Sequence, residues 1–208
     1  MGLVNIFSPF YYIKSLNDDH LKIKDRYLDD IIDNYNNKPN LSPDWNVHTS
    51  YNMDSYLKNK LDWNYALDFY SKYIDEFIYS YFNKSLNWEL CGGIWYTAYG
   101  PGQTANIHEH VPDIFSIVHF IKFNPEVHWP VTFVNPASSY MKLILDKYPN
   151  LRDNINFQDQ NQSLFHPRFT PNVNEGDLVI FPSNLEHLVE KVDSQELRVT
   201  IAFNIKIS

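Results

Sequence analysis

The sequence predicts an α+β fold in which helices come first and a two-sheet barrel or jelly roll follows. Three observations predict it. A chain of 208 residues that are 44% hydrophobic is large enough to bury one substantial core. Its apolar residues recur at helical spacing up to Trp88 and with a period of two afterwards. The second part also divides into short apolar runs separated by turn residues, which is typical of sandwiches and barrels.

Two helices are predicted before Trp88. The first spans residues 18–37, and the second spans residues 63–82, where the apolar stripe is wide enough to cover the face of a sheet. The stripe of the first helix consists of Leu21, Leu28, Ile31, Ile32 and Tyr35, and that of the second of Ala66, Leu67, Tyr70, Tyr73, Ile74, Phe77, Ile78 and Tyr81. A polar stretch rich in turn residues, 34–44, follows the first helix, and Leu3–Ile13 is a further candidate strand. We therefore expect residues 1–88 to be a mainly helical support region whose helices pack on one sheet.

The β core is expected over residues 89–207, within a single domain that spans residues 1–208. Its predicted strands are 89–99, 104–110, 114–123, 131–134, 163–169, 177–181, 187–192 and 196–207. Residues 136–149 interrupt this series and predict a short inserted helix.

The last predicted strand has two unlike faces. Leu197, Val199, Ile201, Phe203, Ile205 and Ile207 form an apolar face, and Arg198, Thr200, Ala202, Asn204 and Lys206 form the other. The apolar face should pack on the core or under the long helix. The other face suits the wall of a ligand cavity, and a solvent-exposed face is the alternative interpretation.

Composition narrows the classes of partner. A net charge of −8 with only four arginines makes a nucleic-acid partner unlikely. No apolar run approaches the roughly 20 residues that a membrane-spanning helix needs, and we expect no membrane partner. The first residues lack the pattern of a signal peptide. The single cysteine, Cys91, excludes an internal disulfide framework and is expected to be an inert buried thiol. We expect a reducing compartment, the cytoplasm.

Three histidines and one arginine carry the chemistry. His108 and His110 lie two apart on a predicted strand, where side chains point the same way, and His187 follows a later strand. Imidazole suits iron, zinc, copper and nickel, and the lack of cysteines argues against a closed structural zinc site. An open site with three ligands favours redox iron and leaves hydrolytic zinc as an alternative. Arg198 offers a planar pair of donors that can hold a carboxylate.

These motifs resemble those of the 2-oxoglutarate- and Fe(II)-dependent oxygenases. The sequence Tyr99-Gly-Pro-Gly, five further residues and His108-x-His110 is similar to the first ligand motif of that superfamily. The segment Gly176-Asp-Leu-Val-Ile-Phe-Pro-Ser, His187 and Arg198-x-Thr-x-x-Phe-Asn resembles a small family of bacterial and phage oxygenases. Ile6–Pro9 also fits the opening of that family, and the motifs cover residues 95–204. The resemblance implies a double-stranded β-helix, Fe(II), and 2-oxoglutarate as cosubstrate.

The resemblance also implies a ligand set. His108 and His187 would bind the iron, while His110 stands where most of the superfamily has Asp or Glu. We favour His110 as the third ligand, although three neutral imidazoles leave the site about one negative charge short. Glu109 would point to the opposite face of a regular strand, and Asp113 could reach the metal only if the chain turns there.

Four residues are implied to bind the cosubstrate. Arg198 would hold the distal carboxylate of 2-oxoglutarate, and Thr200 and Tyr99 would add hydroxyl groups. His119 could also hydrogen-bond the cosubstrate, with a buried structural histidine as the alternative interpretation. The implied reaction couples decarboxylation of 2-oxoglutarate to oxidation, by hydroxylation, of a small molecule or of a peptide or protein side chain. Aromatic residues that could contact such a substrate are Trp95, Tyr96, Trp129 and Phe165.

Two other classes of protein are consistent with parts of the pattern. Gly102-x5-His108-x-His110 and Gly176-x5-Pro182-x4-His187 also match the two halves of a cupin motif, which would indicate a metal-dependent dioxygenase without 2-oxoglutarate. The glutamate that cupins carry after the histidine pair is missing, and the arginine motif favours the oxoglutarate-dependent class. A jelly-roll domain that binds or assembles without catalysis is the non-enzymatic alternative.

Overall fold

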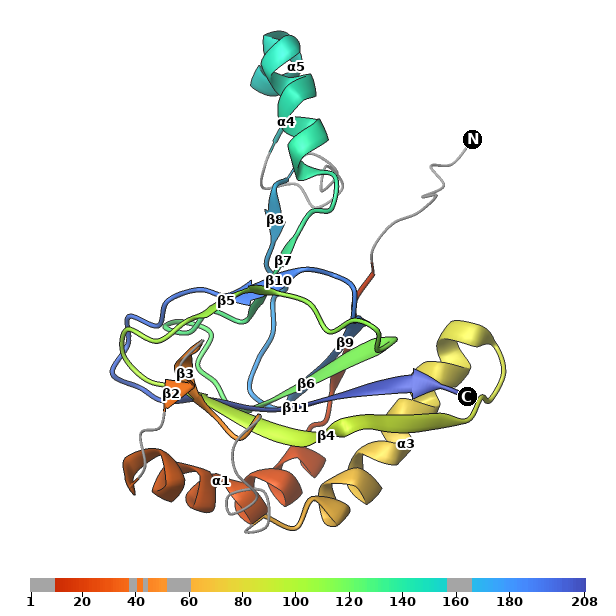
Figure 1. Cartoon of the computed structure of the whole chain (residues 1–208), viewed down its shortest axis with the longest axis vertical. Coiled ribbons are helices and arrows are strands. Elements are labelled where there is room, and N and C mark those ends of the chain that lie inside the picture. Colours follow the sequence, from red (N-terminus) through yellow and green to blue (C-terminus); the bar gives the residue numbers. More distant parts are fainter. Residues whose placement is uncertain (1–9, 38–40, 43–44, 52–60, 157–165) are drawn as a thin grey trace.

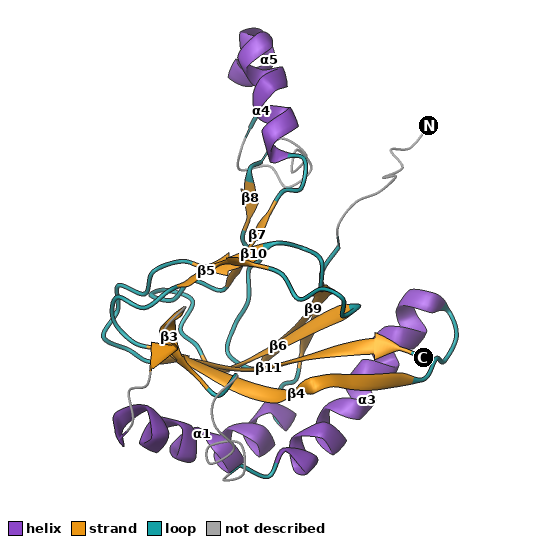
Figure 2. Cartoon of the chain, in the orientation of Figure 1, coloured by secondary structure: helices purple, strands orange, loops and turns teal. Residues whose placement is uncertain are grey.

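The computed structural model describes residues 10–37, 41–42, 45–51, 61–156 and 166–208, and it contains two antiparallel sheets (Figure 1). The larger sheet has the strand order β1-β9-β6-β11-β4-β3-β2, and the smaller has the order β5-β10-β7-β8. Two long helices cover the outer face of the larger sheet, and the smaller sheet lies across its other face (Figure 2). The predicted mixture of helices and antiparallel strands is thus confirmed.

The two long helices and the elements after residue 88 follow the predicted order, whereas two short strands before that residue, Leu41–Ser42 and Trp45–Thr49, were not predicted. The helices are α1 (Asp19–Asn37), α3 (Trp63–Phe82), α4 (Ser138–Lys147) and α5 (Pro149–Asp153). The strands are β1 (Tyr12–Ser15), β2 (Leu41–Ser42), β3 (Trp45–Thr49), β4 (Trp88–Tyr99), β5 (Ala105–His108), β6 (Phe115–Lys122), β7 (Val131–Val134), β8 (Arg168–Phe169), β9 (Asp177–Pro182), β10 (His187–Val189) and β11 (Arg198–Ile207).

Three strands correct the expected division of the chain at Trp88. β1, β2 and β3 all precede that residue, yet β1 pairs with β9 and β3 pairs with β4 in the larger sheet. Residues 1–88 therefore contribute strands as well as helices. The early candidate strand, Leu3–Ile13, overlaps β1 at Tyr12 and Ile13, and its residues 3–9 lie outside the described residues. Residues 163–165, which begin the fifth predicted strand, also lie outside them. The insert predicted at 136–149 forms two helices, α4 and α5.

Helix α3 has the predicted bounds and the predicted buried stripe. Asp62 caps its first turn by accepting a hydrogen bond from the backbone N–H of Asn64. Ala66, Tyr70 and Ile74 are fully buried in the core that the helix shares with the larger sheet. The stripe ends earlier than predicted, because Tyr81 is 52% exposed. The prediction that this helix lies across the outside of one sheet is confirmed (Figure 1).

Helix α1 buries a stripe that coincides only in part with the predicted one. Its buried residues are His20, Ile23, Tyr27, Ile31 and Asn34. Leu21, which we placed in the stripe, is 49% exposed. The prediction was wrong for Leu21, whereas Ile31 is buried and Leu28 and Tyr35 pack against the core. A stripe drawn from apolar residues alone also missed a histidine on the buried face of α1 that has a hydrogen-bond partner inside the fold.

The side chains of β11 alternate between the two faces of the larger sheet, as the sequence predicts. Its apolar side chains, such as Ile201 and Phe203, share one core with α1 and α3. Arg198, Thr200 and Ala202 point the other way, into a cavity. This alternation is interrupted after Phe203, which pairs with Ile94, whereas Asn204 pairs with Cys91. The skipped residues of β4 are glycines 92 and 93, whose positive φ angles of 71° and 112° are strained for other residues.

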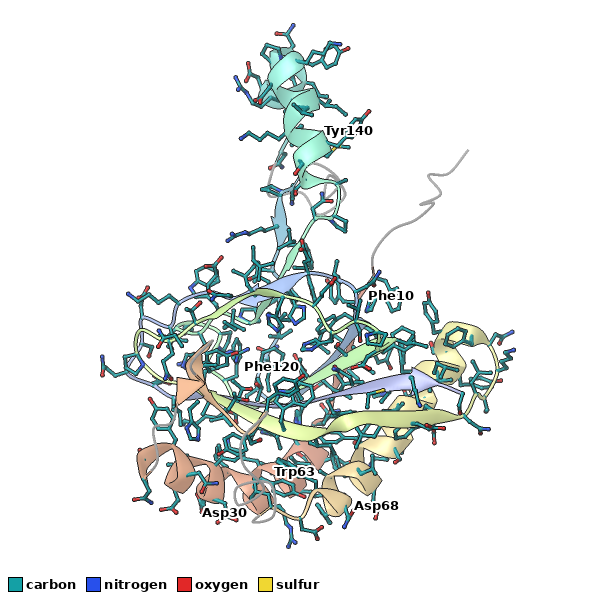
Figure 3. All side chains as sticks on the ribbon, in the orientation of Figure 1. Phe10, Asp30, Trp63, Asp68, Phe120 and Tyr140 are labelled. Carbon is teal, nitrogen blue, oxygen red and sulfur yellow. The ribbon has the colours of Figure 1, made fainter. Side chains whose placement is uncertain are left out.

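The inserted helices project from the rest of the chain. α4 and α5 follow β7, next to the edge strand β8 of the smaller sheet, and extend away from the rest of the chain, with Tyr140 on this projection (Figure 3). Tyr140 and Leu143 are 64% and 68% exposed. Among the described residues, no helix combines the length and apolarity that a membrane span requires.

Candidate metal centre

Three histidines from different segments meet between the sheets. His108 is the last residue of β5 and pairs in register with His187, the first residue of β10. His110 follows two residues after His108. The ring centroid of His187 lies 4.2 Å from that of His108 and 5.2 Å from that of His110. One nitrogen from each ring lies within 4.8 Å of the others, so the three side chains can hold one metal ion.

His110 reaches this cluster by a route that the sequence did not predict. The strand expected over 104–110 ends at His108. His110 is held instead by its backbone: its N–H donates to Ser183 O at 2.8 Å, and its carbonyl accepts from the N–H of Asp113 at 3.0 Å. A hydrogen bond to the facing segment, rather than the alternation of a strand, therefore directs this ring toward the other two.

The end of the strand also changes the position of the acidic neighbours. Glu109 lies just beyond the end of β5 and is among the residues that line the same cavity as the histidines, so the regular strand on which its expected opposite orientation depended is absent there. Its carboxylate does not belong to the converging group of ligand atoms. Asp113 accepts a hydrogen bond from Asn204 Nδ2 at 2.8 Å and is likewise outside that group.

The histidines are oriented and kept neutral by their surroundings. The Nδ1 atoms of His108 and His187 donate to the carbonyls of Asn106 and Leu185 at 2.7 and 2.8 Å, which leaves the lone pair on Nε2. Burial lowers the pKa of His108, lowers that of His110 to about 4, and lowers that of His187 well below its ordinary value. Neutral imidazole is the form that binds a metal, so the site is prepared for ligation at neutral pH.

A cavity of about 380 Å³ adjoins the cluster. Its wall combines the polar face of β11, the facing part of β4 and the smaller sheet, and it consists of Val47, Thr49, Tyr51, Trp95, Thr97, Tyr99, His108, Glu109, His110, Val118, Val131, His187, Val189, Arg198, Thr200 and Ala202. Sequence reasoning missed Thr49, Thr97 and Val118. The two threonines could have been found only from the pairing of β3 with β4, which brings their hydroxyl groups within 3.2 Å.

Arg198 is the buried cation of this cavity. Its side chain is 1% exposed, its Nε donates to the carbonyl of Trp129 at 3.0 Å, and its charge lies 4.7 Å from the ring of Tyr99. Its Nη1 atom is buried without a hydrogen-bond partner, and no carboxylate within the described residues pairs with it. Burial lowers the pKa of Arg198 to about 10, so the guanidinium stays charged at neutral pH. A buried, unpaired cation facing a cavity is suited to an anionic ligand.

The other expected cosubstrate residues divide into two groups. Thr200 and Tyr99 are buried and line the cavity with Arg198. His119 does not. It lies on the opposite face of β6, where its Nε2 is 3.1 Å from His20 Nδ1 and its Nδ1 is 2.8 Å from the hydroxyl of Tyr70. The expectation for His119 was therefore wrong, because both of its ring nitrogens are engaged with the helices.

The four aromatic residues suggested as substrate contacts do not all lie at the cavity. Of the suggested substrate-contacting aromatics, Trp95 lines the cavity, whereas the hydroxyl of Tyr96 is bound to His48 and the side chain of Trp129 is 49% exposed. Phe165 lies outside the described residues. Cys91 is half-buried rather than buried, and burial raises its pKa to about 11, which agrees with an inert thiol.

Three imidazoles beside a buried guanidinium define a class of protein, a metal-dependent enzyme with room for an acidic small molecule. The model of a protein family described as "Putative 2OG-Fe(II) oxygenase" matches residues 93–204, more than half of the chain, and the chain belongs to this family. It is therefore a 2-oxoglutarate-dependent oxygenase, an oxidoreductase, and its family uses Fe(II) and 2-oxoglutarate. No sequence among the curated proteins matches the chain.

Solved structures share the fold at low sequence identity. AviO1 from Streptomyces viridochromogenes has a TM-score of 0.59 at 12% identity, with 95% of this chain and 90% of that chain covered. The viral collagen prolyl hydroxylase from Paramecium bursaria Chlorella virus-1, in complex with 2-oxoglutarate, has a TM-score of 0.51 at 13% identity, with 95% and 96% covered. A prolyl-4-hydroxylase from Pseudomonas putida has a TM-score of 0.52 at 11% identity, with 96% and 94% covered.

Proposed function

We propose that this oxygenase is a hydroxylase whose iron is bound by His108, His110 and His187 and whose cosubstrate is bound by Arg198. One observation carries the proposal: the three converging imidazoles and the unpaired buried guanidinium line one cavity. A bound Fe(II) would supply the redox chemistry that couples oxidative decarboxylation of 2-oxoglutarate to oxidation of a substrate. The cupin alternative gives no reason for a buried guanidinium here.

The cavity wall around Arg198 suits one end of a dicarboxylate. The guanidinium can donate two parallel hydrogen bonds to a carboxylate, and the buried Nη1 would then gain the acceptor that it lacks. Thr200, on the same face of β11, can add a hydroxyl donor. The ring of Tyr99 stabilises the guanidinium, and its hydroxyl is a further candidate donor.

His110 takes the place that a carboxylate occupies in most of the superfamily. Its ring lies among the converging ligand atoms, whereas Glu109 and Asp113 do not, which supports a site of three histidines. Such a site carries one negative charge fewer than two histidines and a carboxylate. We expect this difference to weaken the electrostatic attraction for Fe(II).

The proposal also covers the fold, the location and the substrate. The two sheets would form a double-stranded β-helix, with the whole chain acting as one domain in the cytoplasm. The substrate would be a small molecule or a peptide or protein side chain. Similar folds in two prolyl hydroxylases support an amino-acid side chain as one possibility, and the low content of arginine disfavours nucleic acid.

Binding can be tested without knowledge of the substrate. We expect the full chain to bind Fe(II) or the redox-inert Mn(II) under anaerobic conditions, and then to bind 2-oxoglutarate in isothermal calorimetry. Glutarate, which has the same carbon chain without the keto group, is the control ligand and should bind more weakly. If metal-loaded protein does not bind 2-oxoglutarate, or binds glutarate equally well, the proposed cosubstrate site is wrong.

A further inference from the structure

Two aromatic side chains and one carboxylate belong to residues that line the cavity and have no role in holding the iron or the cosubstrate. Trp95, on β4, has its ring centroid 5.9 Å from that of His110. Tyr51 follows β3, and its ring lies 4.9 Å from that of Trp95 at an angle of 59°. Tyr51 is 42% exposed and Trp95 is 9% exposed, so the two rings form an aromatic wall that leads from the solvent to the metal centre.

Glu109 is the third of these side chains. It is exposed and is the only acidic residue among the described residues of the cavity wall. Its carboxylate forms no ion pair with any cation within the described ranges. Arg198, the only lysine or arginine among the described residues of the wall, is fully buried. In this described part of the wall, the positive charge is therefore inside and the negative charge is at the solvent side.

We propose that the substrate presents a cationic group, an ammonium or a quaternary ammonium, to Tyr51, Trp95 and Glu109. The proposal rests on the function proposed above, since it assigns the inner part of the cavity to iron and 2-oxoglutarate. Aromatic faces attract cations, and a carboxylate adds a charge-assisted contact. A neutral apolar substrate would have to desolvate Glu109 without compensation, and an anionic substrate would be repelled by it.

Matched pairs of probes isolate the charge. Choline is compared with 3,3-dimethyl-1-butanol, the uncharged isostere in which carbon replaces nitrogen. N-acetyl-lysinamide is compared with N-acetyl-norleucinamide, which lacks the ammonium group. The first pair represents a small quaternary ammonium compound, and the second represents a lysine side chain. Each probe is titrated calorimetrically into the full chain loaded with Mn(II) and 2-oxoglutarate. In the pair that resembles the substrate, the cation should bind roughly tenfold or more tightly than its neutral partner.

Variants test the residues. Glu109→Gln keeps the size of an exposed side chain and should reduce the preference for the cation by roughly three- to tenfold. Tyr51→Leu should reduce it by a similar factor, because the aromatic face is lost. Glu186→Gln is the matched control: Glu186 is also exposed and adjoins His187, yet it does not line the cavity, so the preference should stay at the wild-type value.

Two results would overturn the inference while the proposed function stands. The first is equal binding of cation and isostere in both pairs by wild-type protein that binds 2-oxoglutarate. The second is a preference that Glu109→Gln and Tyr51→Leu both leave unchanged. Melting temperatures and affinities for 2-oxoglutarate, measured for every variant, separate these results from misfolding. Failure of the wild type to bind 2-oxoglutarate would instead remove the proposed function, and this inference with it.

Discussion

Arg198→Met separates a cosubstrate-binding role from a structural one. Methionine keeps most of the length and the apolar stem but removes the charge and the donors. Arg198 is a fully buried cation whose Nε donates to the carbonyl of Trp129 and whose guanidinium lies over the ring of Tyr99. Such a residue contributes little to the stability of the empty protein, whereas it should contribute strongly to binding an anion.

The magnitudes follow from the same environment. Burial lowers the pKa of Arg198 to about 10 from 12.5, which corresponds to about 3 kcal/mol of cost for the charged form in the folded chain. The substitution removes this cost, but it also removes the hydrogen bond to Trp129 and the ring contact with Tyr99, which are worth about 1–2 kcal/mol each. We therefore expect the ligand-free melting temperature to change by less than about 4 °C. Loss of the partner to a buried carboxylate should cost about 2–5 kcal/mol, roughly 30-fold to several thousandfold in the Kd for 2-oxoglutarate.

The assay combines calorimetry on Mn(II)-loaded protein with melting curves recorded with and without 2-oxoglutarate. Arg168→Met is the control, because Arg168 is half-exposed, pairs with Glu190 and does not line the cavity. That variant should bind 2-oxoglutarate like the wild type. The reasoning is refuted if Arg198→Met binds 2-oxoglutarate with wild-type affinity, or if it unfolds far below the wild type while its affinity is retained.

Three further predictions concern the metal ligands, the core and the effect of pH. His110→Ala should weaken Fe(II) binding and His110→Asp should retain or strengthen it, as measured by anaerobic titration; wild-type affinity in the alanine variant would show that His110 is not a ligand. Ile74→Ala should lower the free energy of unfolding by about 2–5 kcal/mol in urea denaturation, because Ile74 is fully buried under the larger sheet, and a change below 1 kcal/mol would contradict that packing. Burial lowers the pKa of His119 well below 6.5. Below about pH 6.5 this histidine is therefore protonated in the unfolded chain but not in the folded chain, and the free energy of unfolding should fall as the pH drops. In metal-free protein, His119→Gln should make that fall shallower by up to about 1.4 kcal/mol per pH unit, and an unchanged slope in pH-dependent unfolding would count against the shifted pKa.

Elements with one buried face were predictable from the sequence. Helix α3 and strand β11 each bury a single apolar face, so the spacing of their side chains fixes both the type of element and its orientation. Strands β1, β2 and β3 were poorly predicted because they are short and lie among turn residues, where a period of two has no room to develop. They join the larger sheet through pairing with distant strands, which local pattern does not record.

The residues of the metal centre could be predicted from their motifs, whereas the geometry of His110 could not. Its orientation depends on the hydrogen bond from its N–H to Ser183, a contact across 73 positions of sequence, and the strand that was expected to direct it stops at His108. The same early end of the strand brings Glu109 to the cavity. The irregular backbone after β5 thus determines the positions of both His110 and Glu109 relative to the cavity.

His119 shows why alternation alone assigns the wrong face on a strand that is buried on both sides. In β6 nearly every side chain from Phe115 to Ile121 is buried, so the sequence carries no contrast between the two faces. Pairing with β11 supplies that contrast, because directly paired residues of adjacent strands point to the same side of a sheet. His119 pairs with Ile201, whose side chain faces the helices, and Val118 pairs with Ala202, which lines the cavity. Once Arg198 sets the cavity face of β11, this register requires His119 to lie on the other side of the sheet, and no rotation of its side chain can bring it into the cavity.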